Sequence, residues 1–383
     1  VNGTMAHVLD YDDVGGFGHP SVVILPAVLA IGEKCHISGK DVLLSYIVGF
    51  EVGSRLGQLS RRAYAVGWHS TCTIGTIAAA AAAAKALKLN NENTQMALGI
   101  ATSLAGGLKQ NFGTMTKSLH AGNAARNGVI AATLAQKGFT ADKNIIENPQ
   151  QGFLRVLNTG ADVELERVTE GLGEYYNIVP GPESAEGRMA GIGFKAFASC
   201  LMTHTNIEAA LHLRNAYDIR AEKISKVECM THELAPVTCL HSCPKNGLEG
   251  KFSIQYCVAR ALLDGEVGMK HFSDEAVRQS EIQELMKKVK FGPPTQTFAS
   301  EVVIELQDGK KYTQQVNRPK GTSENPMTWE EMSYKYKDCA SFILPVEAVQ
   351  KSQELITSLE SLEDISTLMD IVTCKQDITS KVY

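Results

Sequence analysis

Seven consecutive alanines at residues 78–84, inside the segment TIAAAAAAAKALKL, constrain the fold of this chain more than any other feature. Alanine is the best helix former and has almost no side-chain bulk, so a helix built from it can pack closely against its neighbours. Apolar residues recur at spacings of three and four throughout 21–137. Start signals precede further small-residue segments at 90–108 and 120–138. We therefore predict an all-helical N-terminal part over 1–178.

The pattern changes after this part. Residues 179–193 are rich in proline and glycine and indicate a boundary. Beyond them, ISKVECMTHEL and ASEVVIELQDGKKYTQQVN alternate as strands do, and the Asp308-Gly309 pair predicts a hairpin turn. Helical patterns at 203–215 and 252–264 are interleaved with these strands.

These elements predict an α+β domain over 179–327. Residues 328–383 return to helical periodicity, and we expect them to pack against the first helices. The predicted fold is therefore mainly α, with a large all-helical domain and a smaller α+β domain.

Charge and composition exclude several classes of protein. The net charge is -5, and the 37 lysines and arginines are scattered, which argues against nucleic acid as a partner. No apolar run is long enough to span a bilayer, so we expect no membrane segment. Nine cysteines without regular spacing favour a reducing compartment and free thiols.

Ionisable residues gather in the segment LDYDDVGGFGHPSVVILP, residues 9–26. Asp12 and Asp13 precede a glycine-rich turn and have a simple alternative interpretation as a helix cap and a turn. Asp10 and His19 flank the turn, so their carboxylate and imidazole could converge for acid–base chemistry.

Two further segments of the helical part carry candidates. His69 precedes the alanine-rich helix, where a lone histidine is more often structural. Lys117 and His120 lie three residues apart at a predicted helix start, which favours an anion site. The alternative there is a solvated lysine and a capping histidine.

The second half contains GFKAFASCLMTH, with Lys195, Cys200 and His204. The segment 229–243 holds three cysteines together with His232 and His241, and a metal-binding protein built on it is an alternative. Its spacing lacks the paired cysteines of structural zinc sites, so we expect no metal there. The segment GIGFKA lacks a preceding strand in a βαβ unit and signals no nucleotide cofactor.

Taken in order, NGTMAHVLDYDD, GWH, KSLHAGNAARNG, FKAFASCLMTH, KFSIQYCVARALLDGEV and EVVIELQDGKKY resemble the MmgE/PrpD family from residue 2 to residue 371. This family includes 2-methylcitrate dehydratase, cis-aconitate decarboxylase and iminodisuccinate epimerase. The resemblance implies a cofactor-free enzyme, usually a homodimer, whose α+β domain is a lid over the helical domain. It also implies that the site lies between the two.

The resemblance assigns the site residue by residue. It places the catalytic groups at Asp10, His19, His69 and Lys117, and substrate-binding groups at His120 and His204. We expect Lys195 and His241 to bind substrate as well. No metal and no other cofactor is expected.

The chain also departs from the family pattern. The helical segment with which family members begin is absent, so we expect an N-terminal part to be missing, any targeting signal with it. Residues 180–191 resemble an insertion, and Val14 stands where the decarboxylase has threonine. A truncated, inactive relative is therefore an alternative to an enzyme.

The segment KSLHAGNAARNG resembles the decarboxylase and epimerase branch more than the dehydratases. The implied function is a lyase for a small di- or tricarboxylate, namely decarboxylation of cis-aconitate or a related unsaturated acid. Dehydration of the 2-methylcitrate type and epimerisation of the iminodisuccinate type are the alternatives. We expect the protein in the cytoplasm or the mitochondrion.

Overall fold

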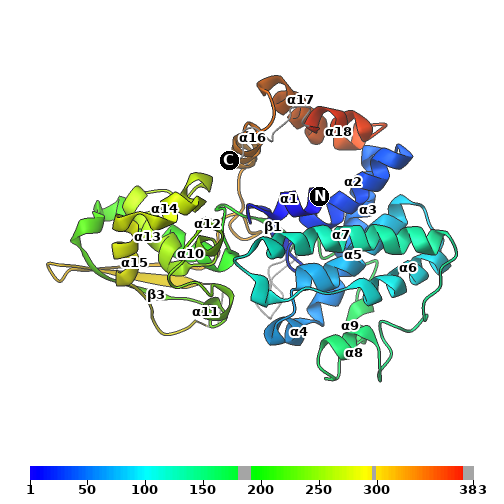
Figure 1. The fold of residues 1–383 in the computed structure, drawn as a ribbon, viewed down its shortest axis with the longest axis horizontal. Coiled ribbons are helices and arrows are strands. Elements are labelled where there is room, and N and C mark those ends of the chain that lie inside the picture. The colour runs from blue at the N-terminus through cyan, green and yellow to red at the C-terminus, as the bar shows by residue number, and fades with distance from the viewer. Residues whose placement is uncertain (180–190, 296–298, 374–383) are drawn as a thin grey trace.

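The computed structural model describes residues 1–179, 191–295 and 299–373. The predicted insertion at 180–191 lies outside this part apart from Gly191. Helices dominate the described chain, which confirms the mainly α class, and Figure 1 shows most of the first ones gathered on one side of the molecule. The first helices are α1 Asn2–His7, α2 Ser21–Cys35, α3 Gly39–Gln58, α4 Arg61–Val66, α5 Ser70–Ala86, α6 Asn91–Leu104, η1 Lys109–Asn111, α7 Met115–Gln136, α8 Phe153–Leu157 and α9 Glu166–Thr169.

The remaining elements mix helices with strands. The helices are α10 Leu201–Tyr217, η2 Ala221–Lys223, α11 Ala235–Thr238, α12 Gly247–Gly250, α13 Ile254–Asp264, η3 Met269–Phe272, α14 Asp274–Arg278, α15 Ser280–Lys288, α16 Trp329–Ala340, α17 Val346–Thr357, η4 Leu359–Ser361 and α18 Ser366–Val372. The strands are β1 Asp13–Gly15, β2 Ile192–Phe194, β3 Ile224–Met230, β4 Val289–Phe291, β5 Ser300–Leu306 and β6 Lys311–Val316.

The alanine-rich helix α5 lies at the centre of the first helices and packs against α2, α3, α6 and α7. Each alanine of 78–84 is at most 2% exposed. Glycines on the facing helices bring the backbones still closer. A Cβ added at Gly128 of α7 would lie 2.6 Å from the carbonyl carbon of Ala79 and 2.7 Å from the amide nitrogen of Ala80. The small-residue pattern therefore specifies close helix packing, as the sequence predicts.

A two-stranded sheet of β1 and β2 corrects the expectation that the N-terminal part is all-helical. Val14 pairs with Gly193, so the ionisable loop is joined to the chain that follows the predicted boundary. The strands approach closely at Gly15, where a Cβ would lie 2.5 Å from the carbonyl oxygen of Gly191. Sequence periodicity misses β1 because three residues are too short to show alternation.

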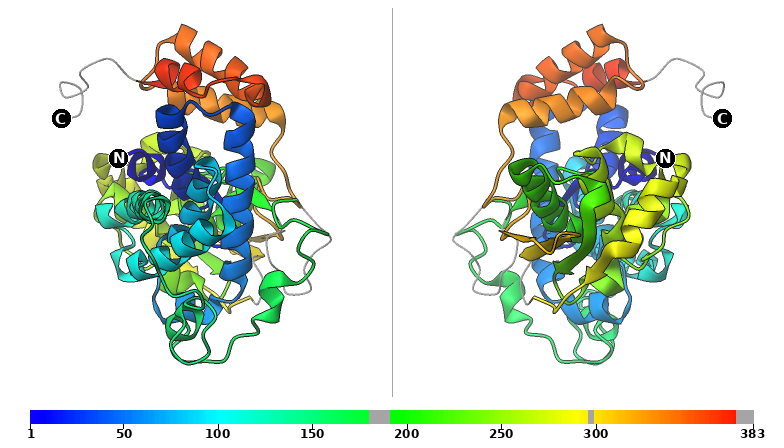
Figure 2. Two further views of the ribbon diagram at one scale, coloured as in Figure 1. Left: turned by 90° about the vertical axis from the view of Figure 1, so that its right-hand side faces the viewer. Right: turned by 90° about the vertical axis from the view of Figure 1, so that its left-hand side faces the viewer.

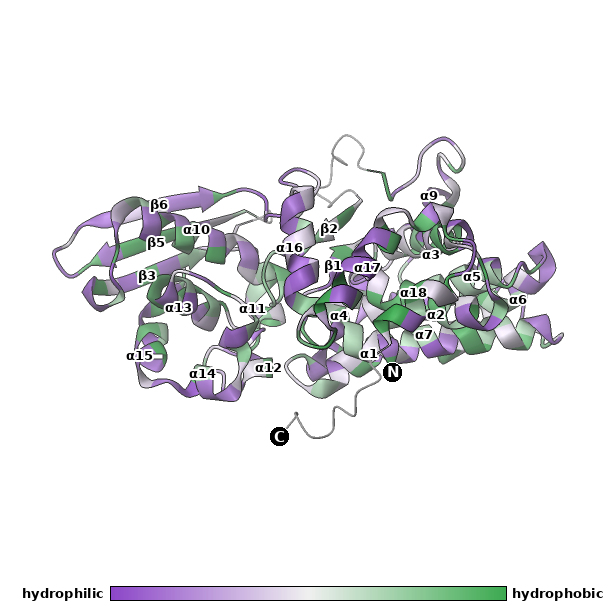
Figure 3. Ribbon diagram, turned by 90° about the horizontal axis from the view of Figure 1, so that it is seen from above, coloured by the Kyte–Doolittle hydropathy of each residue, from purple (hydrophilic) through white to green (hydrophobic). Residues whose placement is uncertain are grey.

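The larger sheet has the strand order β4-β3-β5-β6. β3 pairs in parallel with β4 and antiparallel with β5, and β5 and β6 form the hairpin that Asp308-Gly309 predicts. Helices α10, α13 and α15 contact the sheet. In β5, Ser300, Val302 and Ile304 are buried in alternation with less buried residues. Figure 3 shows β6 largely hydrophilic at the sheet edge.

Two main groups of buried apolar residues form the core, one among α2–α7 and one between the larger sheet and its helices. The C-terminal helices contribute Ile365 and Leu368 to the first group. The Ile365 amide donates to the Ile37 carbonyl at 3.0 Å, and Figure 2 shows α16–α18 above the ends of α2 and α3. The division into domains at 178 and 327 stays a prediction.

The eight cysteines that lie within the described ranges are free thiols, and Cys374 lies outside those ranges. Across the same ranges, no helix has both the length and the apolar character that crossing a bilayer requires.

We predict that Gly128→Ala destabilises the protein although alanine is the better helix former. The added methyl group meets the backbone of α5, which cannot move without disturbing the other helices packed on it. Overpacking of this kind costs about 1–3 kcal/mol. Urea unfolding measures the change. Gly106→Ala is the control, because its Cβ would meet no atom within 4 Å. Equal stability of the two variants would contradict the close packing.

Candidate active site

The carboxylate of Asp10 lies at the centre of a buried charge cluster. Asp10 has a left-handed backbone with φ 49°, in the loop that follows α1. Its Oδ1 lies 2.7 Å from Lys117 Nζ and 3.0 Å from Lys195 Nζ. Burial by itself raises the pKa of the Asp10 carboxyl, but the two ammonium groups outweigh burial and hold this pKa well below its usual range. The carboxylate is therefore ionised and binds both lysines.

The loop histidine His19 contacts two groups through one nitrogen. Its Nδ1 lies 2.7 Å from the carbonyl oxygen of Asp13 and 2.9 Å from Asp12 Oδ2, and only the first contact has hydrogen-bond geometry. Since a carbonyl oxygen can only accept, Nδ1 of His19 carries a proton. Proton exchange with a substrate would therefore take place at Nε2, which accepts a proton in the neutral ring and donates one in the imidazolium. The side chain is 14% exposed.

Asp12 accepts a hydrogen bond from His7, the last residue of α1. His7 Nδ1 lies 3.0 Å from Asp12 Oδ1, and His7 Nε2 lies 2.8 Å from Lys117 Nζ. Burial lowers the pKa of His7 to about 4, although Asp12 opposes this shift. The interpretation of Asp12 as a cap or turn residue is therefore wrong, because its carboxylate lies between two histidines.

Asp13 fits the simpler interpretation. Its carboxylate accepts from the backbone amide of Ser21 at 3.2 Å and from the Ser21 hydroxyl at 2.6 Å, which satisfies the start of α2. Burial, together with the neighbouring Asp12, raises the pKa of Asp13 to about 6.

His69 and His120 meet where α5 and α7 begin. Their Nδ1 atoms lie 3.0 Å apart. Burial lowers the pKa of both rings, so at neutral pH each is uncharged. A neutral imidazole has one N–H, so one Nδ1 donates and the other accepts. The pair therefore has one Nε2 that accepts a proton and one Nε2–H that donates.

The structure contradicts the simple alternatives for the start of α7. Lys117 lies in the first turn of α7 as predicted, but it is only 5% exposed and is not a solvated lysine. His120 does not cap α7, since Thr114 accepts the amide of Thr116 there.

His204 lies near the cluster. It is fully buried in α10, and its Nε2 lies 3.3 Å from the Ser199 carbonyl, so Nε2 donates and Nδ1 has no partner among the described residues. Burial lowers its pKa to about 3, with the charge of Lys195 as a second cause.

His241 lies further out, with its Nε2 3.3 Å from the Phe112 carbonyl. The ring of Phe112 packs edge-on against His69, so His241 borders the cluster without joining it. In the same segment, Cys229 is buried in β3 and Cys243 is exposed. These side chains therefore lie in different surroundings, which does not favour the alternative metal site.

Two lysines that the sequence analysis missed tie the loop to the second half of the chain. Lys251 Nζ donates to the carbonyls of Leu9 and Ala198, at 2.6 and 2.9 Å. Lys335 of α16 donates to the Lys195 carbonyl at 2.7 Å and lies over the ring of Tyr11. Burial lowers the pKa of each lysine to about 8.

One group of described side chains has the atom types of a metal site, with ligand atoms within 4.8 Å of one another in His7, Asp10, Asp12 and His19. The surroundings do not fit a cation. The ammonium of Lys117 contacts both Asp10 and His7, and Lys195 adds a second positive charge. We therefore interpret the group as an ionic hydrogen-bonded network.

The structure thus brings together six of the eight predicted site residues, leaves His204 close by and places His241 at the border. It also adds His7, Asp12, Lys251 and Lys335. Of these, only His7 and Asp12 had a sequence signal, because they stand within five residues of Asp10 in one segment rich in ionisable groups.

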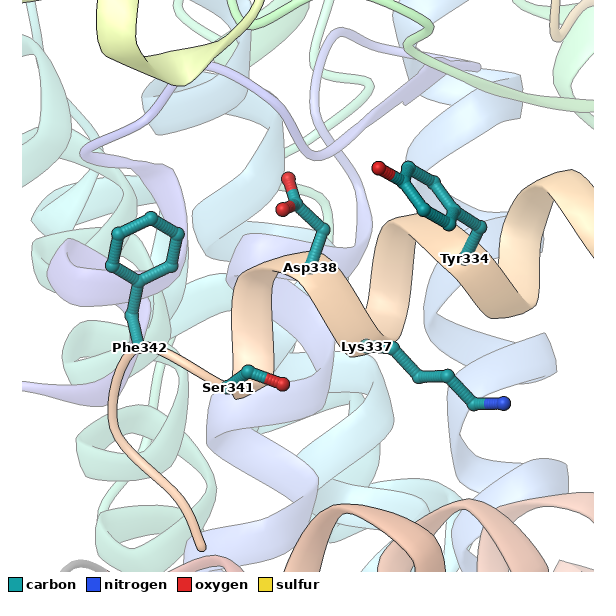
Figure 4. A pocket seen from close by; sticks show the side chains of 5 residues that line it. All are labelled: Tyr334, Lys337, Asp338, Ser341 and Phe342. Carbon is teal, nitrogen blue, oxygen red and sulfur yellow. The ribbon is translucent and has the colours of Figure 1, made fainter. Parts of the chain in front are cut away.

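A separate surface hollow of about 360 Å³ lies on α16 and the turn that follows it (Figure 4). Its lining consists of Tyr334, Lys337, Asp338, Ser341 and Phe342. None of the predicted site residues lines this hollow.

Comparison with known proteins covers both halves of the chain. Residues 1–166 match the model of the MmgE/PrpD N-terminal domain, and residues 197–361 match the MmgE/PrpD C-terminal domain. A cis-aconitate decarboxylase of Aspergillus terreus is 30% identical over 93% of this chain and 76% of its own length. A cis-aconitate decarboxylase of Mus musculus is 30% identical over 100% and 80%. A 2-methylcitrate dehydratase of Escherichia coli is 25% identical over 82% and 68%.

We predict that Asp13 makes stability fall as pH rises. Its folded pKa of about 6 lies above the ordinary aspartate pKa of 3.8, so between these values the folded state binds more protons than the unfolded state. Asp13→Asn keeps an acceptor for Ser21 and removes this titration. Relative to wild type, its free energy of unfolding should rise by about 2–3 kcal/mol between pH 4 and pH 7. Urea unfolding at each pH measures this difference. Parallel curves would mean that Asp13 does not titrate in this window.

Proposed function

Because the chain belongs to the MmgE/PrpD family, we propose that it is a cofactor-independent lyase that decarboxylates cis-aconitate or a related unsaturated di- or tricarboxylate. One observation carries the proposal: two buried ammonium groups, Lys117 and Lys195, bind the carboxylate of Asp10 in the loop that also carries His19, whose Nε2 has no partner among the described residues. The identity to cis-aconitate decarboxylases over most of the chain supports the choice of substrate.

The charges of the cluster suit an anionic substrate. Lys117 shares its ammonium among Asp10, His7 and the faces of Phe112 and Phe252. We propose that a substrate carboxylate binds Lys117, and that Asp10 holds Lys117 and Lys195 in place for it. The substrate-binding roles of His120, His204, Lys195 and His241 belong to the same proposal.

Decarboxylation needs one proton. As the bond to the leaving carboxylate breaks, its electron pair moves toward the double bond, and the distant alkene carbon takes a proton. Carbon dioxide leaves, and the acid recovers its proton from water. We propose that His19 gives this proton from Nε2, because its Nδ1 is held by the Asp13 carbonyl and an imidazolium there would lie beside Asp12. The His69–His120 pair supplies a second donor and acceptor.

Access to these groups requires movement. Asp10, His69, Lys117 and Lys195 are each at most 5% exposed. A tricarboxylate reaches them only if the loop and the segments that carry Lys195 and Lys251 separate. We therefore propose that substrate binding opens the contacts of these lysines with the loop.

A panel of three substrates tests the function. The chain is incubated with cis-aconitate, 2-methylcitrate and iminodisuccinate, and products are followed by NMR. We expect turnover of cis-aconitate to carbon dioxide and an unsaturated dicarboxylate. Exclusive turnover of 2-methylcitrate or iminodisuccinate would replace decarboxylation by dehydration or epimerisation. No turnover of any of the three would contradict the proposal.

We predict that Lys117→Ala lowers kcat/KM at least about tenfold. Hydrogen bonds to charged groups are worth about 1.5–3 kcal/mol, and about 1.4 kcal/mol corresponds to a factor of ten. Some thermal stability should also be lost, since Asp10 keeps only Lys195. Lys288→Ala is the control, because this lysine donates to the Ile224 carbonyl at 2.6 Å, away from the cluster. Normal kcat/KM in folded Lys117→Ala would show that Lys117 is structural.

The homodimer that the family resemblance implies also stays a prediction, and analytical ultracentrifugation measures it. The cytoplasmic or mitochondrial location is a prediction as well.

A further inference from the structure

His7 contacts both a lysine and a carboxylate, and its side chain is 0% exposed. Its Nε2 lies 2.8 Å from Lys117 Nζ, and its Nδ1 lies 3.0 Å from Asp12 Oδ1. The other oxygen of Asp12 lies 2.9 Å from His19 Nδ1. Two groups with different proposed roles, Lys117 and His19, are therefore connected through His7 and Asp12.

The hydrogen-bond directions at His7 are fixed by chemistry. An ammonium group has three donors and no acceptor, so Lys117 donates and His7 Nε2 accepts. The single proton of the neutral ring must then be on Nδ1, from which it donates to Asp12. Each nitrogen of His7 is occupied, and no solvent reaches the ring. His7 is therefore suited to orient its neighbours and not to exchange protons with a substrate.

We propose that His7 is a positioning residue that couples carboxylate binding at Lys117 to proton transfer at His19, by holding the Lys117 ammonium with one ring nitrogen and the Asp12 carboxylate with the other. This inference rests on the proposed function, which assigns substrate binding to Lys117 and proton transfer to His19. The contact with Lys117 and the contact with Asp12 can be removed one at a time, because each uses a different nitrogen of the His7 ring.

Other charged and titratable groups also face these residues. Around His19 they are Asp10, Asp12, Asp13, His7 and His69, and around Asp12 they include Lys195 and Lys335. Substitutions at His7 leave all of these except His7 itself in place. A change in the surroundings of His19 in such a variant therefore reports on the contact between His7 and Asp12.

Two substitutions at His7 each remove one contact of the ring and keep the other. In His7→Asn the amide N–H takes the place of Nδ1 and still donates to Asp12, but the contact with Lys117 is lost. In His7→Gln the amide oxygen takes the place of Nε2 and still accepts from Lys117, but the contact with Asp12 is lost. We expect His7→Asn to raise KM about tenfold and to leave kcat within about threefold of wild type.

We expect the opposite effects on KM and kcat in His7→Gln. KM should stay within about threefold of wild type, a factor that corresponds to less than about 0.7 kcal/mol. The value of kcat should instead fall about tenfold, since Asp12 is no longer held beside His19. His36→Gln and His36→Asn are matched controls, because His36 also pairs with an aspartate, at 2.8 Å, but on the surface.

Nitrogen-15 NMR of the ligand-free protein tests the coupling without turnover. The ring nitrogen resonances of His19 should shift in His7→Gln and stay in place in His7→Asn, because only His7→Gln loses the contact that holds Asp12 beside His19. Asp12→Asn keeps an acceptor for His7 and removes the charge beside His19, so it should also shift these resonances if either His7 variant fails to fold. If the wild type turns over no substrate but these shifts occur, the proposed function fails and the positioning of Lys117 and Asp12 by His7 stands. Identical effects of the two His7 variants, or unshifted His19 resonances in His7→Gln and Asp12→Asn, would mean that His7 is only structural.

Discussion

The rest of the site depends on one buried carboxylate, Asp10, that binds two ammonium groups. Removing a carboxylate and two lysines from water is expensive, and only close, well-directed contacts compensate for it. Lys117 comes from the start of α7 and Lys195 from the chain after β2, so the contact fixes two distant segments against one loop. Deleting either lysine would leave the buried Asp10 carboxylate with a single counterion. Many neighbouring groups are therefore needed to hold both lysines beside Asp10.

The packing of the alanine-rich helix determines where these groups meet. Because α5 has small side chains and Gly128 of α7 packs against it, the backbones of the two helices come into close contact. Their N-terminal ends therefore lie together, and His69 and His120 come within 3.0 Å. The helix core and the polar cluster are two consequences of the same close approach.

Histidines with identical side chains differ in this site because of their partners. The Nε2 of His19 has no partner in the part of the chain that the structure describes, and this side chain is partly exposed. Both nitrogens of His7 contact other side chains, and His204 is buried with a low pKa. These differences support the proposal that proton transfer belongs to His19 and not to His7 or His204. The relatives named as cis-aconitate decarboxylases support the same type of chemistry, which needs one mobile proton and fixed positive charge.

The sequence by itself determined the helices around the alanine run, the hairpin at Asp308-Gly309, the family and most of the residues of the cluster. It did so because helix propensity, turn chemistry and ordered motifs are local properties of the chain. Only the tertiary structure decided that Asp10 pairs with lysines, that Asp12 and not Asp10 contacts His19, and that Lys117 is buried. It also revealed β1, His7, Lys251 and Lys335 as parts of one arrangement. Partners more than a hundred residues apart, such as His7 and Lys117, are chosen by the packing of whole elements, and no local pattern encodes a distance between them.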